Sequence, residues 1–253
     1  MKSKRLMVIL AHPDDESFPI GGTLAKVAAE DGEVMRVTAT RGEAGIPGLS
    51  PDEAGRVRER ELRAACDVLG VRQLCILGYR DGTLETVDTN TAADTLANLM
   101  RAFRPDVVIT FSPDGISGHP DHVTVHRWAM TAFKRAWRAG WAERLYFIAP
   151  SEATAQGCGV PPSGEQVGGA VAYVDVGAHL VTKARAMQCH TSQNPPVQGD
   201  PAEAAAQLVC HEVFTRIWPA DGPALEGDLF GDENADRRLR PEYTQEVLAA
   251  CCT

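Results

Sequence analysis

Short apolar runs alternate with longer amphipathic stretches through the first 150 residues of the chain. The apolar runs are rich in β-branched residues and end at turn residues, which is typical of buried strands. We expect strands at 6–11, 34–40, 74–79, 106–112 and 144–149. The amphipathic stretches between them predict helices at 21–32, 51–70, 91–103 and 122–137. This alternation predicts an α/β fold with a Rossmann-like, largely parallel sheet flanked by helices.

The pattern weakens after residue 150. Residues 151–169 are rich in Gly and Pro and predict a surface excursion, which we interpret as a candidate lid. Beyond it, the pattern predicts one strand at 170–176 and helices at 179–190 and 201–218. The stretch from Pro219 is acidic and turn-rich, and no element is predicted there.

The chain shows no internal repeat and no linker. We therefore expect a single domain over 1–253, with a core of about 5–218, an elaborated C-terminal third and an acidic tail at 219–253. A length of 253 residues is enough for one well-filled core. The hydrophobic fraction of 44% and charged fraction of 23% are ordinary for a soluble globular protein, so composition gives no sign of disorder.

Charge and hydrophobic run length exclude several classes of protein. A net charge of -9 argues against a broad nucleic-acid-binding face, because phosphate contacts need clustered Lys and Arg. No apolar run reaches the ~20 residues of a membrane span. The run after the basic start is shorter than the ~7–15 residues of a signal peptide's apolar region, so we expect a cytoplasmic protein. The seven cysteines lack C-x-x-C spacing, and we expect reduced thiols, including the adjacent Cys251 and Cys252.

Polar side chains follow four of the predicted strands. The sequence HPDDE (12–16) follows the first strand, RGEAG (41–45) the second, RDG (80–82) the third and SPDGISGHPDH (112–122) the fourth. Because ligands bind outside the carboxyl ends of parallel strands, we expect these segments to form one site.

The histidines and acids in these segments predict a metal site. Hydrolytic zinc takes three His or carboxylate ligands and keeps one position for water. His12 and Asp15 lie three residues apart in a turn, as do His119 and His122, so His12, Asp15 and either His119 or His122 form a sensible set. His126, one turn beyond His122, is a rival third ligand. Either segment alone is more often a capped helix entry, and tandem acids also bind magnesium, although the histidines favour zinc-like ions.

HPDDE behind an N-terminal strand, with GHPDH (118–122) about a hundred residues later, resembles the LmbE-like (PIG-L) family of zinc-dependent N-acetylglucosaminyl deacetylases. The likeness extends over roughly residues 5 to 195. Further similar segments follow in the family's order: TRGEAG (40–45), Arg58 with Glu61, LGYRDG (77–82), RPDVVITFSPDG (104–115) and KARAMQCHTSQ (183–193).

The resemblance implies residue roles and a reaction. It implies that His12, Asp15 and His122 hold Zn²⁺ or another divalent transition metal. It further implies Asp14 as general base and His119 as the donor that stabilises charge on the former carbonyl oxygen. The implied substrate is a small acetylated amino-sugar conjugate, hydrolysed by metal-bound water, and family members often form homo-oligomers.

The remaining roles are substrate contacts. The resemblance implies binding of sugar hydroxyls or a neighbouring anionic group by Arg58 and Asp81, with His190 and Gln193 lining the pocket. Taken alone, Arg58 could equally pair with Glu61 on a solvated helix face. Asp81 could be a turn residue, and His190 could cap or pack at a helix end. Gly42 and Gly45 indicate a tight loop near the site.

Three other functions compete with an N-acetyl sugar deacetylase. An amidase acting on a larger thiol S-conjugate or another amide would keep the same metal site. A non-catalytic metal- or sugar-binding module has no use for a base such as Asp14. A nucleotide-binding protein would need G-x-G-x-x-G after the first strand, where the chain has only Gly21 and Gly22. SFPIGG (17–22) and the segment after His190 depart from the family pattern and put the substrate in doubt.

Overall fold

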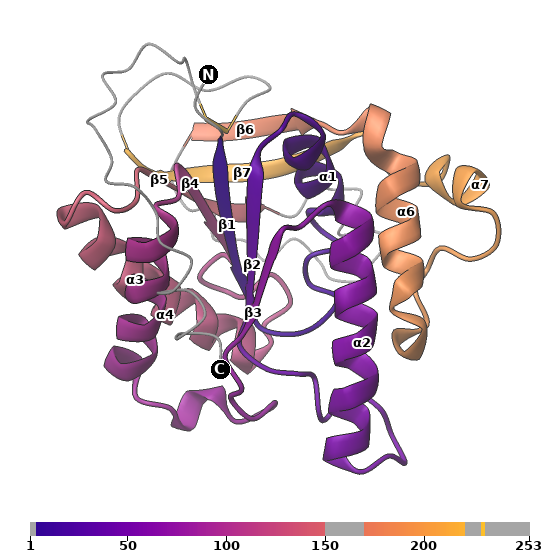
Figure 1. The fold of residues 1–253 in the computed structure, drawn as a ribbon, viewed down its shortest axis with the longest axis horizontal. Helices are drawn as coiled ribbons and strands as arrows, with labels where there is room; N and C mark the ends of the chain where they lie inside the picture. Colours follow the sequence, from indigo (N-terminus) through magenta and orange to yellow (C-terminus); the bar gives the residue numbers. More distant parts are fainter. Residues whose placement is uncertain (1–3, 150–169, 221–228, 231–253) are drawn as a thin grey trace.

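The computed structural model describes residues 4–149, 170–220 and 229–230 of the chain. Its centre is a single seven-stranded sheet (Figure 1). The strands are β1 (Arg5–Leu10), β2 (Glu33–Thr38), β3 (Gln73–Ile76), β4 (Val107–Thr110), β5 (Arg144–Ala149), β6 (Ala170–Asp175) and β7 (His211–Trp218). Their order is β3-β2-β1-β4-β5-β7-β6, with β1 to β5 parallel and β7 antiparallel to both of its neighbours.

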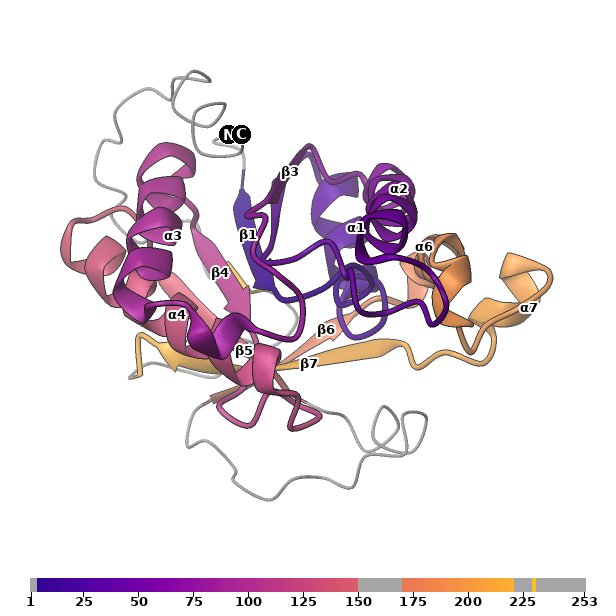
Figure 2. The same cartoon turned by 90° about the horizontal axis from the view of Figure 1, so that it is seen from below.

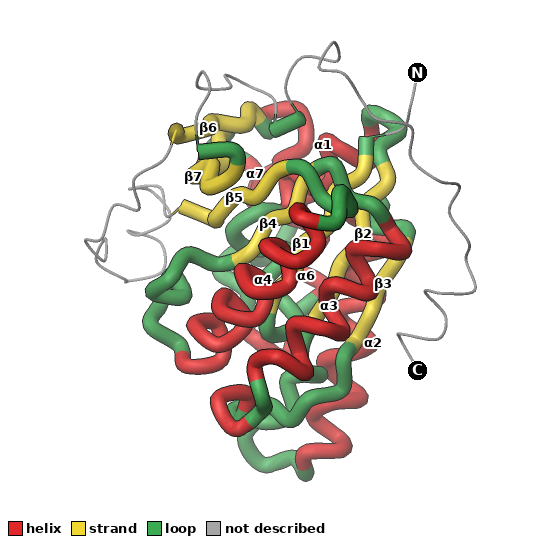
Figure 3. Tube along the Cα trace, turned by 90° about the vertical axis from the view of Figure 1, so that its left-hand side faces the viewer, coloured by secondary structure: helices red, strands yellow, loops and turns green. Residues whose placement is uncertain are grey.

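Helices cover both faces of this sheet (Figure 2). They are α1 (Gly21–Ala29), α2 (Pro51–Leu69), α3 (Thr89–Phe103), α4 (Pro120–Arg138), α6 (Leu180–Cys189) and the short α7 (Pro201–Ala205). Helices α1, α2 and α6 lie on one face, and α3 and α4 lie on the other, in front of the strands in Figure 3. The predicted α/β class and largely parallel sheet are therefore confirmed.

The strand order reverses between β1 and β4. From β1 the chain crosses to β2 by α1, whereas from β4 it crosses to β5 by α4, on the opposite face. The two loops therefore leave the sheet in opposite directions, and in sheets of this kind such a switch point forms a crevice at the carboxyl ends of the strands. The crevice is the position at which this architecture binds ligands.

Most predicted elements are found close to their expected bounds, but the helix expected at 201–218 is wrong. The chain there forms α7, a turn, and then strand β7. In β7 the buried positions include Glu212 and Arg216, so polar residues occupy the face that alternation would assign to apolar ones. Val213, Phe214 and Ile217 do favour a strand. The alternation of apolar and polar residues was not visible, however, because Glu212 and Arg216 occupy buried positions.

Glu212 ties the C-terminal third of the chain to α1. Its carboxylate accepts hydrogen bonds from the backbone N–H groups of Gly22 (2.9 Å) and Thr23 (2.7 Å), which are unpaired donors of the first helical turn. Lys183 of α6 donates to the same carboxylate at 2.6 Å. A Cβ on Gly22 would lie 2.6 Å from Val176 Cβ, so glycine is needed for this close approach.

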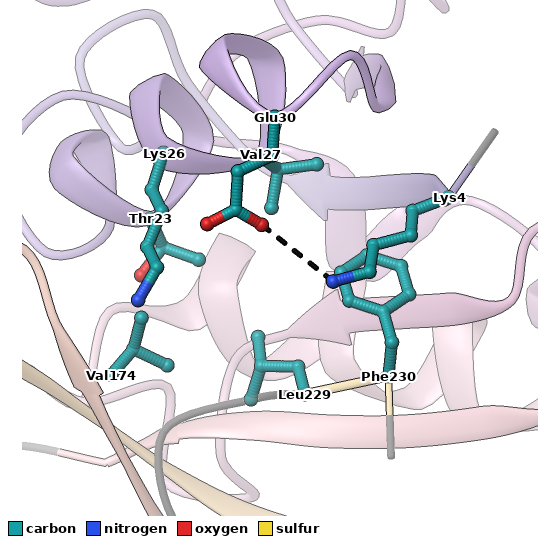
Figure 4. A pocket seen from close by; sticks show the side chains of 8 residues that line it. All are labelled: Lys4, Thr23, Lys26, Val27, Glu30, Val174, Leu229 and Phe230. Carbon is teal, nitrogen blue, oxygen red and sulfur yellow. Dashed lines mark ion pairs between the residues drawn. The ribbon is translucent and has the colours of Figure 1, made fainter. Parts of the chain in front are cut away.

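The hydrophobic core extends beyond the expected limit at residue 218. Leu229 and Phe230 are buried in it, and the Tyr146 hydroxyl donates to the Leu229 carbonyl at 3.0 Å. Both residues also line a cavity of about 200 Å³ with Lys4, Lys26 and other residues of α1 and β6 (Figure 4). This cavity adjoins the start of β1, at the opposite end of the strand from the polar segments.

The remaining sequence expectations concern the candidate lid, membrane spans and the cysteines. The candidate lid at 151–169 and the pair Cys251 and Cys252 lie outside the described residues. No described helix is long and apolar enough to cross a membrane. Cys66, Cys189 and Cys210 are free, as expected, but Cys75 is disulfide-bonded, so the expectation of reduced thiols is wrong for that residue. Pairing depends on which segments meet in space, which spacing along the chain does not reveal.

The buried ion pair predicts a large stability loss on Glu212→Ala. This substitution leaves the Lys183 ammonium buried without its partner and should lower the free energy of unfolding by about 3–5 kcal/mol. Chemical denaturation measures the loss, with the exposed Glu203→Ala as control. The double variant Lys183→Met/Glu212→Gln, which strands no charge, should lose less. A loss below about 1 kcal/mol for Glu212→Ala would show that the pair does not hold α1.

Candidate active site

Two histidines from the loops after β1 and β4 meet in the crevice. His12 follows β1, and His122 lies in the first turns of α4. The His12 Nδ1 atom is 3.2 Å from the His122 Nε2 atom, although 110 residues separate them in sequence. Asp15 lies between them, with Oδ2 3.8 Å from His12 Nδ1 and Oδ1 3.4 Å from His122 Nε2.

Backbone contacts fix which nitrogen of His122 faces this centre. Its Nδ1 atom lies 3.0 Å from the Gly115 carbonyl oxygen, and a carbonyl can only accept, so Nδ1 carries the proton. The ring is stacked on Phe111, with centroids 4.1 Å apart and planes 6° from parallel. The Nε2 lone pair of the neutral ring is therefore held toward His12 and Asp15.

Two carboxylates orient His12 from the other side. Its Nε2 atom lies 3.1 Å from Asp81 Oδ1 and 3.3 Å from Asp121 Oδ2. Asp121 is fixed by the backbone N–H groups of Gly82 and Leu84, and Asp81 by that of Ala44. The proton of His12 therefore sits on Nε2, leaving Nδ1 as the ligand atom, which is the usual arrangement for metal-binding histidines.

This pairing outweighs burial in the electrostatics of His12. Burial alone lowers the pKa of the imidazole, but the hydrogen bonds to Asp121 and Asp81 raise it to about 10 in the metal-free chain. Our sequence interpretation did not include Asp121, although its place between His119 and His122 in GHPDH was a usable signal. Asp81 contacts a candidate ligand, and its expected contact with substrate stays a prediction.

Asp15 and His119 are the candidates for a third ligand. The atoms of His12, His119 and His122 lie within 4.8 Å of one another. However, His119 Nδ1 accepts the Asp121 backbone N–H at 3.1 Å, so in the neutral ring the proton is on Nε2 and no lone pair remains. Burial raises the pKa of Asp15, but the facing His122 and His12 outweigh it and lower the value, which keeps the carboxylate ionised.

The separation of the two histidine nitrogens suits a tetrahedral ion. Ligand atoms about 2.05 Å from a tetrahedral zinc lie ~3.3 Å apart, and His12 Nδ1 is 3.2 Å from His122 Nε2. Asp15 approaches the two nitrogens through different oxygens, with Oδ1 3.4 Å from His122 Nε2 and Oδ2 3.8 Å from His12 Nδ1. Two imidazole nitrogens and one carboxylate are also the donor types of hydrolytic zinc sites. These residues therefore supply donors that suit a metal ion. The rival His126 has its Nδ1 2.8 Å from the Phe111 carbonyl oxygen, and its ring packs edge-on against Phe147, with centroids 4.8 Å apart.

Asp14 lies beside this centre in an unusual backbone conformation. Its φ angle is 103°, a region that residues other than glycine rarely adopt. Arg58 of α2 donates to Asp14 Oδ2 at 2.9 Å. Burial, followed by the charge of Asp15, raises the pKa of Asp14 to about 7 in the metal-free chain, and the Arg58 charge opposes this rise.

A network of buried charged side chains holds the backbone of the turn at residues 12–16. Glu16 Oε2 accepts the Asp14 N–H at 3.2 Å, and Arg36 donates to the His12 carbonyl at 2.8 Å. Arg36 and Glu16 are themselves 3.5 Å apart. His190 Nε2 lies 2.7 Å from Glu16 Oε1, and the His190 side chain has no exposed surface. His190 therefore packs beneath the turn instead of lining a substrate pocket, because Glu16 draws it into the interior.

The segment after His190 is bound to α2 and to the loop after β2. Glu61 accepts hydrogen bonds from the Thr191 hydroxyl, the Ser192 N–H and the Ser192 hydroxyl at 2.6–2.8 Å. Gln193 Nε2 donates to the Gly45 carbonyl at 3.2 Å. Gln193 thus lies on the loop that also receives Arg58, and its expected contact with substrate stays a prediction.

The fold and this centre define an α/β enzyme with a candidate His/Asp metal site at the switch point of its sheet. Residues 7–133 match the family model described as GlcNAc-PI de-N-acetylase (PIG-L). The chain is 34% identical to a 1D-myo-inositol 2-acetamido-2-deoxy-alpha-D-glucopyranoside deacetylase of Actinosynnema mirum, with 90% of this chain and 96% of that protein covered. The chain belongs to the PIG-L family and is a deacetylase, which is an amide hydrolase.

Solved structures agree on the fold. A conserved protein of Thermus thermophilus superposes with a TM-score of 0.63 at 26% identity, over 88% of this chain and 98% of that one. GalB of Pseudomonas putida, a 4-carboxy-2-hydroxymuconate hydratase, has a TM-score of 0.67 at 19% identity, over 88% and 99%. Since that protein is a hydratase, the architecture alone does not define the reaction, and residues at the site must.

The contact between Asp81 and His12 predicts a metal-binding defect in Asp81→Asn. Loss of the carboxylate charge should weaken metal affinity about 10–100-fold, because the orientation of a ligand histidine depends on its carboxylate partner. Competition against a chromophoric chelator measures this affinity, with the exposed Asp94→Asn as control. Unchanged affinity combined with a raised KM would instead favour the expected contact between Asp81 and substrate.

Proposed function

We propose that the chain is a zinc-dependent deacetylase that removes acetate from a small N-acetylglucosamine-containing conjugate. The observation that carries the proposal is the convergence of His12 Nδ1, His122 Nε2 and Asp15 beside the Arg58-bound carboxylate of Asp14. In this proposal His12, Asp15 and His122 hold the metal. A binding module needs no basic group at that position, so the presence of Asp14 favours catalysis.

The residues divide the proton transfers between them. A bound zinc ion supplies Lewis acidity, which lowers the pKa of water to ~7 and polarises the amide carbonyl. Asp14 takes the proton of the attacking water at Oδ1, because Oδ2 is engaged by Arg58. His119 donates from Nε2–H to the carbonyl oxygen as its negative charge develops. When the C–N bond breaks, the departing amine takes a proton either from Asp14, which holds the proton of the attacking water, or from His119. Burial, followed by the charges of His12 and His122, lowers the pKa of His119 and keeps it a neutral donor.

The names of two relatives support the proposed substrate class. The protein of Actinosynnema mirum is named for a sugar in which 2-acetamido-2-deoxyglucose is joined to myo-inositol. Its counterpart in Salinispora arenicola has the same name and is 32% identical over 91% of this chain and 92% of that one. We therefore propose an N-acetylglucosaminyl inositol as the first substrate to test. A homo-oligomeric state, which the family resemblance implies, and a cytoplasmic location, which the lengths of the apolar runs suggest, are also proposals.

Turnover should depend on Asp14. In the zinc-loaded enzyme, Asp14→Asn should lower kcat for acetate release about 10²–10⁴-fold, because it removes the base while leaving the metal ligands in place. The assay compares N-acetylglucosaminyl inositol, chitooligomers and an acetylated thiol S-conjugate, and metal content is measured on each variant. Chelation should abolish turnover in the wild type. If none of these compounds releases acetate while zinc is bound stoichiometrically, the proposed deacetylation of N-acetylglucosaminyl conjugates is wrong.

His119 should affect the chemical step and not metal binding. His119→Ala should lower kcat about 10²–10³-fold, the usual cost of losing one donor to a developing oxyanion. Zinc stoichiometry should stay at the wild-type value, because the Nδ1 atom of His119 is engaged by the backbone. Metal analysis after dialysis distinguishes the alternatives, since a variant that loses its zinc would make His119 a ligand in place of Asp15.

A further inference from the structure

Arg58 reaches the candidate base from a helix that is fixed at its start. Helix α2 begins with a capping box, in which Ser50 and Glu53 bond each other's backbone N–H groups. Two turns later Arg58 points inward and is only 4% exposed, unlike Arg63 on the same helix, whose side chain is 57% exposed. The charge of Arg58 is therefore held inside the protein beside the crevice.

Within the described part of the chain, the hydrogen bonds of the Arg58 side chain go to the turn that carries Asp14 and to the loop after β2. Its Nη2 atom donates to Asp14 Oδ2 at 2.9 Å and to the Pro13 carbonyl at 2.6 Å. Its Nη1 atom donates to the Gly42 carbonyl at 3.4 Å, and the buried Nε atom has no hydrogen-bond partner among the described residues. The guanidinium group therefore binds the base and the backbone that precedes it.

The loop after β2 is shaped around this guanidinium group. A Cβ on Gly42 would lie 2.5 Å from Arg58 Nη1, and one on Gly45 would lie 2.2 Å from it. Gly42 has a φ of +73°, so its backbone also favours glycine, but Gly45 has no such constraint. At Gly45, glycine is therefore needed for the space that Arg58 occupies.

We propose that Arg58 is a positioning residue for the reaction, which holds Asp14 Oδ2 so that Oδ1 is directed at the attacking water. A catalytic base that is oriented by a third group is a recurrent arrangement in hydrolases. This inference rests on the proposed function, because it takes Asp14 as the base. It replaces the expected contact between Arg58 and substrate with a contact to the base itself.

Two substitutions test this positioning in the zinc-loaded enzyme. Arg58→Ala should lower kcat about 100-fold, since misplacement of a catalytic group by about 1 Å costs that much, while KM and zinc content stay at wild-type values. Gly45→Ala adds only a methyl group, which displaces the guanidinium group, and should also lower kcat. Arg63→Ala, which alters only an exposed pair with Glu59, is the matched control and should keep wild-type turnover.

The double variant and chemical rescue separate positioning from a general loss of structure. Arg58→Ala/Gly45→Ala should be no slower than Arg58→Ala, because both changes remove the same contact. Methylguanidinium in the buffer should restore turnover to Arg58→Ala and not to Asp14→Asn. Circular dichroism and metal analysis verify that each variant is folded and loaded, and Gly45→Ala keeps the test available if Arg58→Ala does not fold.

The outcomes distinguish this inference from the proposed function. A raised KM with unchanged kcat in Arg58→Ala, or additive losses in the double variant, would overturn positioning by Arg58. If Asp14→Asn keeps wild-type turnover, the proposed base is wrong. If Asp14→Asn is inactive while Arg58→Ala and Gly45→Ala are fully active, the base stands and its positioning by Arg58 does not.

Discussion

The parallel pairing of β1 with β4 is the constraint on which the site depends. Neighbouring strands lie about 4.8 Å apart, so residues that follow their carboxyl ends start within side-chain reach of each other. In the register Leu6↔Val107 to Val8↔Ile109, His12 and the loop to His122 leave the sheet from adjacent positions. Neither loop alone supplies a complete ligand set. The crossovers to opposite faces keep the crevice between the loops open.

Buried charged side chains fix the backbone of the turn that carries Asp14 and Asp15. Arg36 lies in the middle of a parallel strand without any exposed surface, which carries a large desolvation cost. Its contacts, together with those of Glu16, reach the backbone on both sides of Pro13, where the chain must turn to present Asp14 and Asp15. The unfavourable φ of Asp14 persists because these contacts and Arg58 together over-determine the turn.

The sequence predicted the fold and the centre of the site for a physical reason. Apolar periodicity reports burial within one element, and the spacing of His12 with Asp15 is local enough to be read along the chain. Partners from distant elements leave no such signal. The place of Asp121 in GHPDH can be read along the chain, but its contact with His12 cannot. That contact, Arg36 under the turn, and Arg58 on Asp14 are created only by the folded chain.

Strand β7 was missed for the same reason. Its buried Glu212 is accommodated only because the start of α1 and Lys183 lie opposite, and neither partner is near in sequence. A polar residue on a buried face appears inconsistent with a strand until the group that satisfies it is known. The places where periodicity failed are therefore those where the C-terminal third is joined to the first helix.

The family match ends at residue 133. The turn at residues 12–16 and the elements around it are nevertheless held in part by residues far beyond that point. His190 bonds Glu16, Ser192 bonds Glu61, and Gln193 bonds the loop at Gly45. The first half of the chain therefore carries the reactive groups and part of their support, and the segment from His190 to Gln193 supplies the rest. The two histidine motifs therefore do not form a site that can be moved on its own. Grafting them onto another Rossmann-like sheet would transfer the candidate ligands without the residues that hold them in place.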